Sequence, residues 1–160
     1  ITGLKTGNLG ENTFNLLYTA SLQVGAGMQH DITGVMLGGG SRQSVNSSVL
    51  GLLESIRTNF HEVPVAKTGQ VVGSYSTPWG ASAQAVVSKD VSIFTWSDTP
   101  IALTMEPVAP PTYTDGSQVG TITWTAGPKT KSAALVLQGT IEPPSEWWRL
   151  THPAELTGSG

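Results

Sequence analysis

Short β-forming segments separated by closely spaced turn signals dominate residues 62–140, and this pattern most constrains the fold. Six segments rich in β-branched and aromatic residues are candidate strands: 69–75, 84–87, 91–96, 101–106, 118–124 and 132–138. Turn-forming sequences such as Ser88-Lys89-Asp90 and Asp115-Gly116 lie between them. Short strands at this spacing are typical of antiparallel sandwiches. Residues 62–140 are therefore predicted to form a β-sandwich domain.

Prolines interrupt the second half of the chain at two places. The first group, Pro107, Pro110 and Pro111, is predicted to mark a crossing between the two sheets of the sandwich. The second group begins with Pro143-Pro144. Residues 141–160 are accordingly predicted to be an irregular tail.

A different pattern occupies residues 1–61, which the sequence sets apart as another domain. Residues 1–7 are predicted to be a short strand, followed by turn-forming residues 8–13. The runs 14–24 and 31–37 are predicted to form a hairpin, with a break at Gly25-Ala26-Gly27. Three glycines at 38–40 end this sheet segment.

One amphipathic helix is predicted after the hairpin, with Ser41 as its N-cap. Apolar residues recur along about five turns and form one stripe: Val45, Val49, Leu52, Leu53, Ile56 and Phe60. Strand, hairpin and helix form an α/β layer that is too small to close its own core. The predicted fold class is mainly β with one helix, a partial α/β layer followed by an antiparallel β-sandwich.

The composition excludes several classes of function. The 160 residues carry a net charge of −3, so the chain lacks the basic face that nucleic-acid binding needs. No run approaches 18 consecutive apolar residues, and no signal peptide is recognised. The absence of cysteine excludes disulfides, thiolate metal sites and a cysteine nucleophile. A chain that starts at Ile1 without a methionine is interpreted as a fragment or processed product.

The first predicted strand carries the tripeptide Lys5-Thr6-Gly7. Lysine supplies a fixed positive charge, and the threonine hydroxyl can hydrogen-bond a substrate carboxylate. Glycine leaves the strand edge bare, so an extended peptide can lie against it as an added strand. Lys-Thr-Gly is one part of the signature of penicillin-binding serine acyltransferases, beside Ser-x-x-Lys and Ser-x-Asn.

From this tripeptide onwards the chain resembles the C-terminal part of the serine-type D-alanyl-D-alanine carboxypeptidases, the low-molecular-mass penicillin-binding proteins. Residues 3–7 and 15–20 resemble the active-site strand and its neighbour, and 32–38 with the helix after it resembles the next strand and closing helix. Residues 67–73, 87–91 and 116–121 resemble the small C-terminal β domain of the family. Thr2 stands where many members carry an acidic residue.

The resemblance implies removal of the terminal D-alanine from peptidoglycan stem peptides through a serine acyl-enzyme, which penicillins also form. By motif match Lys5 would contribute electrostatics and proton transfer, Thr6 would bind the terminal carboxylate, and Gly7 would permit strand-like docking. No cofactor is implied. Family members are secreted, so an extracellular site in the bacterial cell envelope is expected. Many are membrane-tethered, and residues 141–160 would lead towards an anchor that this chain lacks.

The nucleophile of that family is not found in this sequence. Ser-x-x-Lys needs a serine three residues before a lysine, one helical turn away. The residues at that position before the five lysines are Thr2, Pro64, Val86, Ala126 and Pro128. Lys5 therefore belongs to an incomplete catalytic site. The chain is predicted to be a fragment, with the catalytic-domain remnant at 1–61, that neither hydrolyses D-Ala–D-Ala nor is acylated by penicillin.

Several other motifs are interpreted structurally. Ser44-Val45-Asn46 lies in the predicted helix after Lys-Thr-Gly, whereas the family's Ser-x-Asn precedes that tripeptide, so it is interpreted as a coincidence. A second tripeptide, Lys67-Thr68-Gly69, is predicted to be a turn that opens a strand. The glycines at 38–40 precede a helix where an anion can bind, yet a plain turn is favoured.

The histidines and the tail carboxylates are interpreted as solvated. His30, His61 and His152 are isolated, and without a two-histidine metal spacing no metal site is expected. His30 and Asp31 are adjacent and can pair as a dyad, but a solvated hairpin tip is favoured. The carboxylates of the Pro-rich tail are Glu142, Glu146 and Glu155.

The five tryptophans divide into two groups. Trp96 and Trp124 fall within predicted strands and are expected in the core. Trp79, Trp147 and Trp148 lie in a turn or near the C-terminus, where core packing and contact with a glycan, a protein partner or a membrane interface remain open.

Two functions follow from these observations. In the first, the β domain is a spacer or docking module of a carboxypeptidase whose partners are peptidoglycan stem peptides, β-lactams and the missing N-terminal catalytic segment. The alternative is a non-catalytic β module that binds the cell wall or a protein. An exposed sheet edge and apolar face in residues 1–60 predict self-association, strand exchange or disorder there.

Overall fold

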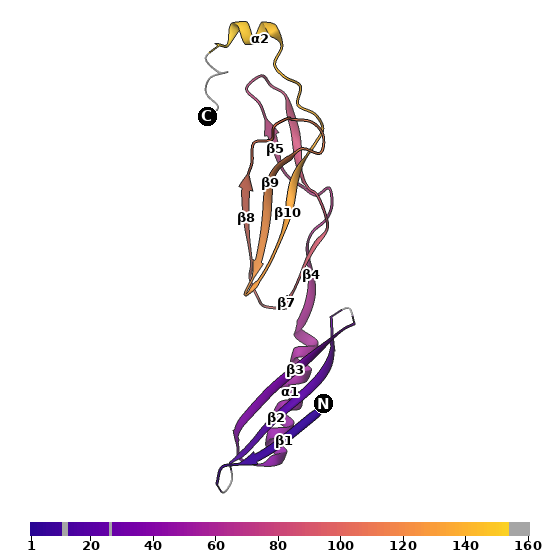
Figure 1. Ribbon diagram of the computed structural model, residues 1–160, viewed down its shortest axis with the longest axis vertical. Coiled ribbons are helices and arrows are strands. Elements are labelled where there is room, and N and C mark those ends of the chain that lie inside the picture. Colours follow the sequence, from indigo (N-terminus) through magenta and orange to yellow (C-terminus); the bar gives the residue numbers. More distant parts are fainter. Residues whose placement is uncertain (11–12, 26, 154–160) are drawn as a thin grey trace. The chain divides into compact units, whose positions relative to one another are not determined.

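The computed structural model describes residues 1–10, 13–25 and 27–153, in which ten strands and two helices occur (Figure 1). The elements are β1 (Gly3–Asn8), β2 (Phe14–Val24), β3 (Met28–Gly39), α1 (Arg42–Asn59), β4 (Phe60–Ala66), β5 (Val71–Ser76), β6 (Ser82–Val87), β7 (Val91–Trp96), β8 (Ile101–Pro107), β9 (Gln118–Ala126), β10 (Lys129–Gln138) and α2 (Glu146–Thr151). The fold is mainly β with antiparallel sheets, as predicted.

The chain divides into two compact units, each of which is described by itself. Unit 1 comprises Ile1–Val63 and Phe94–Thr99, and unit 2 comprises Pro64–Ile93 and Pro100–Gly160. Parts of the predicted turn at 8–13 and of the glycine break at 25–27 lie outside the described residues.

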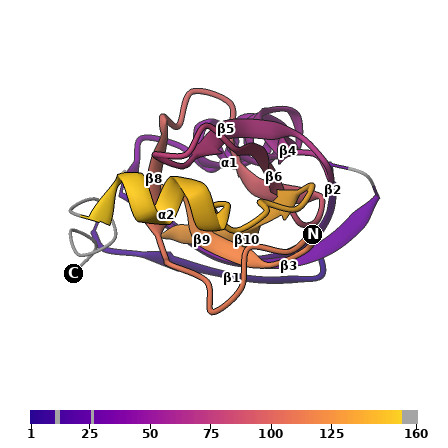
Figure 2. The same ribbon diagram turned by 90° about the horizontal axis from the view of Figure 1, so that it is seen from above.

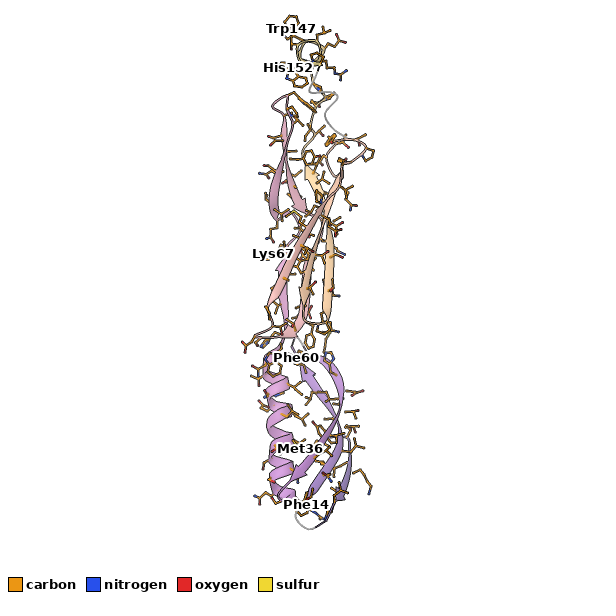
Figure 3. All side chains as sticks on the ribbon, turned by 90° about the vertical axis from the view of Figure 1, so that its left-hand side faces the viewer. Phe14, Met36, Phe60, Lys67, Trp147 and His152 are labelled. Atoms are coloured by element: carbon orange, nitrogen blue, oxygen red, sulfur yellow. The ribbon has the colours of Figure 1, made fainter. Side chains whose placement is uncertain are left out.

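Unit 1 is a three-stranded antiparallel sheet, in the order β1-β2-β3, with α1 packed on one face (Figure 1). Alternate residues of β2 are buried against the helix: Leu16, Tyr18 and Ala20. The residues that α1 adds to this core are Val45, Val49 and Leu53. Met36, labelled in Figure 3, is half-buried and packs against the same cluster. The predicted strand, hairpin and helix are confirmed.

Helix α1 begins where the sequence predicts it. Ser41 is the N-cap and accepts a hydrogen bond from the backbone N–H of Ser44, whose hydroxyl in turn accepts one from the Ser41 N–H. This reciprocal capping satisfies two donors that the first helical turn leaves free. The predicted stripe is wrong at two positions, because Leu52 is 46% exposed and Phe60 begins β4.

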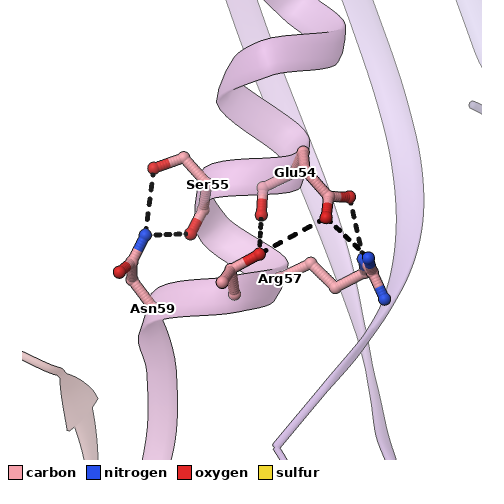
Figure 4. A network of polar contacts seen from close by, with 5 residues as sticks. Glu54, Ser55, Arg57 and Asn59 are labelled. Atoms are coloured by element: carbon pink, nitrogen blue, oxygen red, sulfur yellow. Dashed lines mark hydrogen bonds and ion pairs between the residues drawn. The ribbon is translucent and has the colours of Figure 1, made fainter.

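Polar side chains on the outer face of α1 hydrogen-bond along its last turns (Figure 4). Arg57 donates to both carboxylate oxygens of Glu54, at 2.9 and 2.6 Å, and Asn59 donates to the Ser55 carbonyl at 2.9 Å. The Arg57 guanidinium lowers the pKa of the Glu54 carboxyl. Because the pair is exposed to solvent, it contributes little to folding.

Two glycines allow close packing in unit 1. A Cβ at Gly34 would overlap the ring of Tyr18, and one at Gly39 would overlap the side chain of Val45. Both larger residues are buried in the core between the sheet and α1. The absence of a side chain at these positions therefore sets how closely the core residues approach the sheet.

Unit 2 is built on a five-stranded antiparallel sheet in the order β5-β6-β10-β9-β8. A second sheet pairs β4 with β7, and the parts of these two strands that belong to unit 2 are residues 64–66 and 91–93. Ala66 of β4 and Ile93 of β7 belong to the same buried cluster as Ile122 and Leu137 of the larger sheet. Side chains from two sheets thus share one core, as the sandwich prediction required.

Three expectations for this half of the chain are corrected. The link after Pro107 joins β8 to β9, which are neighbours in one sheet, so it does not cross between sheets. Strand β4 was not predicted; it contains Pro64, a residue type that is uncommon inside strands because it cannot donate to the ladder. The tail was predicted to be irregular, yet 146–151 form α2 (Figure 2), with Ser145 as N-cap. The tail beyond residue 153, with Glu155, lies outside the described residues.

Candidate functional site

The tripeptide Lys5-Thr6-Gly7 lies in β1, at one edge of the unit 1 sheet. All three residues are exposed. Within the described residues β1 pairs with β2 alone, so the backbone groups along its other side have no strand partner. An extended peptide can hydrogen-bond to such an edge as an additional strand.

Neighbouring residues of a strand point to opposite faces, and this separates Lys5 from Thr6. Thr6 lies opposite Leu16, which is buried on the α1 face. Lys5 lies opposite Leu17, which pairs in turn with Val35, and these two residues are 46% and 62% exposed. Lys5 and Thr6 therefore share the strand edge but belong to different faces of the sheet.

Thr6 lines a cavity of about 110 Å³ on the α1 face of β1. Its lining combines polar and apolar residues: Leu4, Thr6, Asn8, Phe14, Asn15, Leu16, Arg42, Val45 and Asn46. The side-chain oxygen of Asn15 already accepts a hydrogen bond from the Gly38 N–H at 2.9 Å. The hydroxyl of Thr6, the guanidinium of Arg42 and the amide of Asn46 are groups that hydrogen-bond carboxylates.

Arg42 and Asn46 were not predicted to lie beside Thr6. Asn46 belongs to Ser44-Val45-Asn46, which was interpreted as a coincidence, and no motif in the sequence includes Arg42. Because Arg42 and Asn46 are four residues apart, they lie on the same face of α1 near its N-terminus. What the sequence did not show is that this side meets β1, because that depends on how α1 packs on the sheet.

The second tripeptide is a turn, as predicted. The N–H and hydroxyl of Thr68 both donate to Oδ1 of Asp90, at 2.7 and 2.8 Å, and Gly69 takes a φ of +78°. These hydrogen bonds from Thr68, together with the nearby charge of Lys67, hold the pKa of the Asp90 carboxyl below its ordinary value. Lys67-Thr68-Gly69 therefore performs a structural role in unit 2.

The three histidines lie in different environments. His61 is exposed, as predicted. His30 is half-buried in β3 and stacks on Phe94, so the prediction of a solvated hairpin tip is wrong. His152 is exposed and stacks on Trp148 with ring centroids 4.7 Å apart. Asp31 accepts a hydrogen bond from the Ser21 hydroxyl at 2.5 Å. No group of three or more potential metal-ligating side chains occurs in the part of the chain that the structure describes. In the same residues, neither helix is long and apolar enough to cross a membrane.

An aromatic cavity of about 500 Å³ occurs in unit 2 beside Trp79. The indole Nε1 of Trp79 donates to the Glu142 carbonyl at 2.8 Å. The hydroxyls of Tyr75 and Tyr113 are 3.4 Å apart, and this hydrogen bond, helped by burial, raises the pKa of Tyr75. Tyr75 does not line the cavity itself; the residues that line it with Trp79, Tyr113 and Glu142 are Thr112, Thr114, Thr140, Ile141, Pro143 and Pro144.

The remaining tryptophans take several positions. Trp124 is buried in the core of unit 2, as predicted. Trp96 is only half-buried and meets Phe60 edge-on in unit 1. Trp148 of α2 contacts Trp79, at a centroid distance of 5.8 Å, whereas the neighbouring Trp147 is 76% exposed. The tail carboxylates at 142 and 146 are exposed as well.

Comparison with known proteins identifies one kind of similarity. The sequence matches no family model and no curated protein. The structure is similar to penicillin-binding protein 5 from Haemophilus influenzae, with 19% sequence identity and a TM-score of 0.46. The match covers 87% of this chain and 42% of the other, so the chain spans less than half of that protein's length.

Proposed function

We propose that the chain is the C-terminal part of a peptidoglycan D-alanyl-D-alanine carboxypeptidase and that β1 recognises the carboxyl end of the stem peptide. The observation that carries the proposal is the position of Lys5-Thr6-Gly7 on an exposed edge strand. The proposed location is the bacterial cell envelope. Unit 2 then serves as a spacer or docking module.

In this proposal the peptide adds to β1 as a further strand. Gly7 presents bare backbone, so that the peptide can approach without meeting a side chain. The Thr6 hydroxyl donates to the terminal carboxylate, and the positive charges of Lys5 and Arg42 stabilise that anion from the two sides of the strand. Because no serine stands three residues before a lysine, the chain by itself binds without cleaving.

A titration of the ¹⁵N-labelled chain with an acetylated peptide ending in D-Ala-D-Ala tests the proposal. The amide resonances of β1 should shift, and the same peptide ending in L-Ala-L-Ala should bind more weakly. Thr6→Val keeps the shape but removes the hydroxyl, and should weaken binding about tenfold, the usual effect of losing a hydrogen bond to a charged group. Thr33→Val, at an exposed site on β3 of the same sheet, is the matched control.

Two results would overturn this proposal. One is a set of shifts that avoids β1 or is unchanged by Thr6→Val. The other is a covalent adduct with a fluorescent penicillin, because the chain is expected to lack the acylated serine.

A second candidate function rests on the Trp79 cavity. Aromatic rings with hydroxyls around them suit a sugar, whose C–H face stacks on the ring while its hydroxyls exchange hydrogen bonds. On this alternative, unit 2 is a non-catalytic module that binds peptidoglycan. Retention of the chain on purified peptidoglycan, lost in Trp79→Ala but kept in Thr6→Val, would favour it. Retention unaffected by Trp79→Ala would exclude the cavity.

A further inference from the structure

Unit 1 contains a cavity that the proposed functions do not use. Its volume is about 240 Å³. The lining residues come from the hairpin, the end of α1 and the segments after it: Val24, His30, Asp31, Ile32, Ile56, Phe60 and Phe94. Three are aliphatic and three carry flat rings. An apolar cavity of about 150 Å³ is large enough for benzene.

Three rings of the lining stack on one another. Phe94 is parallel to His30, with centroids 5.0 Å apart and planes inclined by 13°. It is also stacked on Phe60, at 5.4 Å and 22°. Trp96 meets Phe60 edge-on at 5.3 Å and supports the stack. A series of contacts like this restricts the orientation of each ring that lines the cavity.

His30 brings an unsatisfied polar atom to this cavity. Its Nε2 is buried and has no hydrogen-bond partner among the described residues. The adjacent carboxylate of Asp31 accepts from Ser21. Most buried polar side-chain atoms in folded proteins have a partner, so an exception needs an explanation. When the imidazole proton is on Nδ1, Nε2 is a hydrogen-bond acceptor for which the described residues supply no donor.

We propose that this cavity binds a small, uncharged, planar aromatic molecule with one hydroxyl or ring N–H group. The aromatic ring packs among Phe60, Phe94 and the aliphatic residues, and the polar hydrogen is donated to His30 Nε2. Asp31 is the one acidic residue of the lining, and its charge disfavours an anionic ligand. The site is separate from β1 and from the Trp79 cavity, so its test is independent of both proposed functions.

A pair of fluorinated probes of nearly equal shape tests the hydrogen bond. The full 160-residue chain is titrated with 4-fluorophenol and with fluorobenzene, and binding is followed by ¹⁹F NMR. We expect 4-fluorophenol to bind about three- to tenfold more tightly, which corresponds to one hydrogen bond. His30→Phe keeps a ring to stack on Phe94 but removes the nitrogen, and should abolish this preference. His61→Phe, the same change at an exposed histidine, should preserve it.

A second measurement uses the unaltered chain, so its result does not depend on whether His30→Phe folds correctly. The Nε2 resonance of the ¹⁵N-labelled His30 ring should move on addition of 4-fluorophenol and stay in place with fluorobenzene. Failure of both probes to bind, equal affinity for the two, or a phenol preference that survives His30→Phe would each overturn the proposal. So would a phenol that binds while the Nε2 resonance does not move.

Discussion

Helix α1 packs on the three-stranded sheet whose edge strand is β1, and two leucines of the helix allow that packing to be measured. Leu53 is 6% exposed and belongs to the unit 1 core, whereas Leu50, less than one turn away, is 58% exposed. Both are interior positions of the same helix. Replacing either by alanine makes the same chemical change with the same effect on helix propensity, so the difference between them reports burial alone.

The structure sets the expected size of this difference. Leu→Ala removes three carbons, and at about 0.8 kcal/mol per buried CH₂ the lost burial at Leu53 is roughly 2 kcal/mol. The cavity left behind adds to this, which gives about 3 kcal/mol for Leu53→Ala, inside the usual range for such changes. At Leu50 less than half of the side chain is buried and solvent fills the space, so the loss is at most about 1 kcal/mol.

Native-state hydrogen exchange of the α1 and β2 amides is a suitable assay, because it reports unfolding of unit 1 separately from unit 2. The gap of about 2 kcal/mol corresponds to a roughly 30-fold difference in the opening equilibrium constant between the two variants. Equal protection in Leu50→Ala and Leu53→Ala, or a loss below about 1 kcal/mol at Leu53, would refute the placement of α1 on this sheet.

Three further predictions concern local contacts. Asp90→Asn should lower the unfolding midpoint near neutral pH, and the difference from the unaltered chain should shrink as the pH falls below the ordinary carboxyl pKa of 3.8, because Thr68 stabilises the charged form in the folded state. A difference in unfolding midpoint that does not change with pH would contradict the stabilisation of the Asp90 carboxylate by Thr68. Gly34→Ala should destabilise unit 1 by about 1–3 kcal/mol, since the new Cβ overlaps the Tyr18 ring. Gly51→Ala, in α1 with nothing within 4 Å of the new Cβ, should instead stabilise unit 1 by about 0.5–1 kcal/mol. Urea titrations of the two glycine variants and the unaltered chain measure both changes.

Helices and strands were predictable from the sequence where the residues that specify them are neighbours in the chain. The N-cap at Ser41 and the apolar spacing of Val45, Val49 and Leu53 define α1 almost to the residue, because capping and helical periodicity depend only on neighbours in the chain. The strand 91–96 was predicted with the bounds that it has. In contrast, α2 was missed, because six residues between prolines are too few to show a periodicity.

The candidate sites divide in the same way. Alternation along β1 already separates Lys5 from Thr6, and the exposed tripeptide is visible in the sequence alone. The residues that share the cavity with Thr6 are not visible in the sequence, because Arg42 lines that cavity only as a result of how α1 packs on the sheet.

What the sequence determined by itself is a set of elements and one short motif, since turns, caps and periodicity act over a few residues. The tertiary structure alone decided which side chains meet across long separations. His30 and Phe94 are far apart in the chain, and no local pattern brings their rings to 5.0 Å. Their stack depends on Phe94 of β7 lying against His30 of β3, and the imidazole Nε2 is buried there without a hydrogen-bond partner among the described residues.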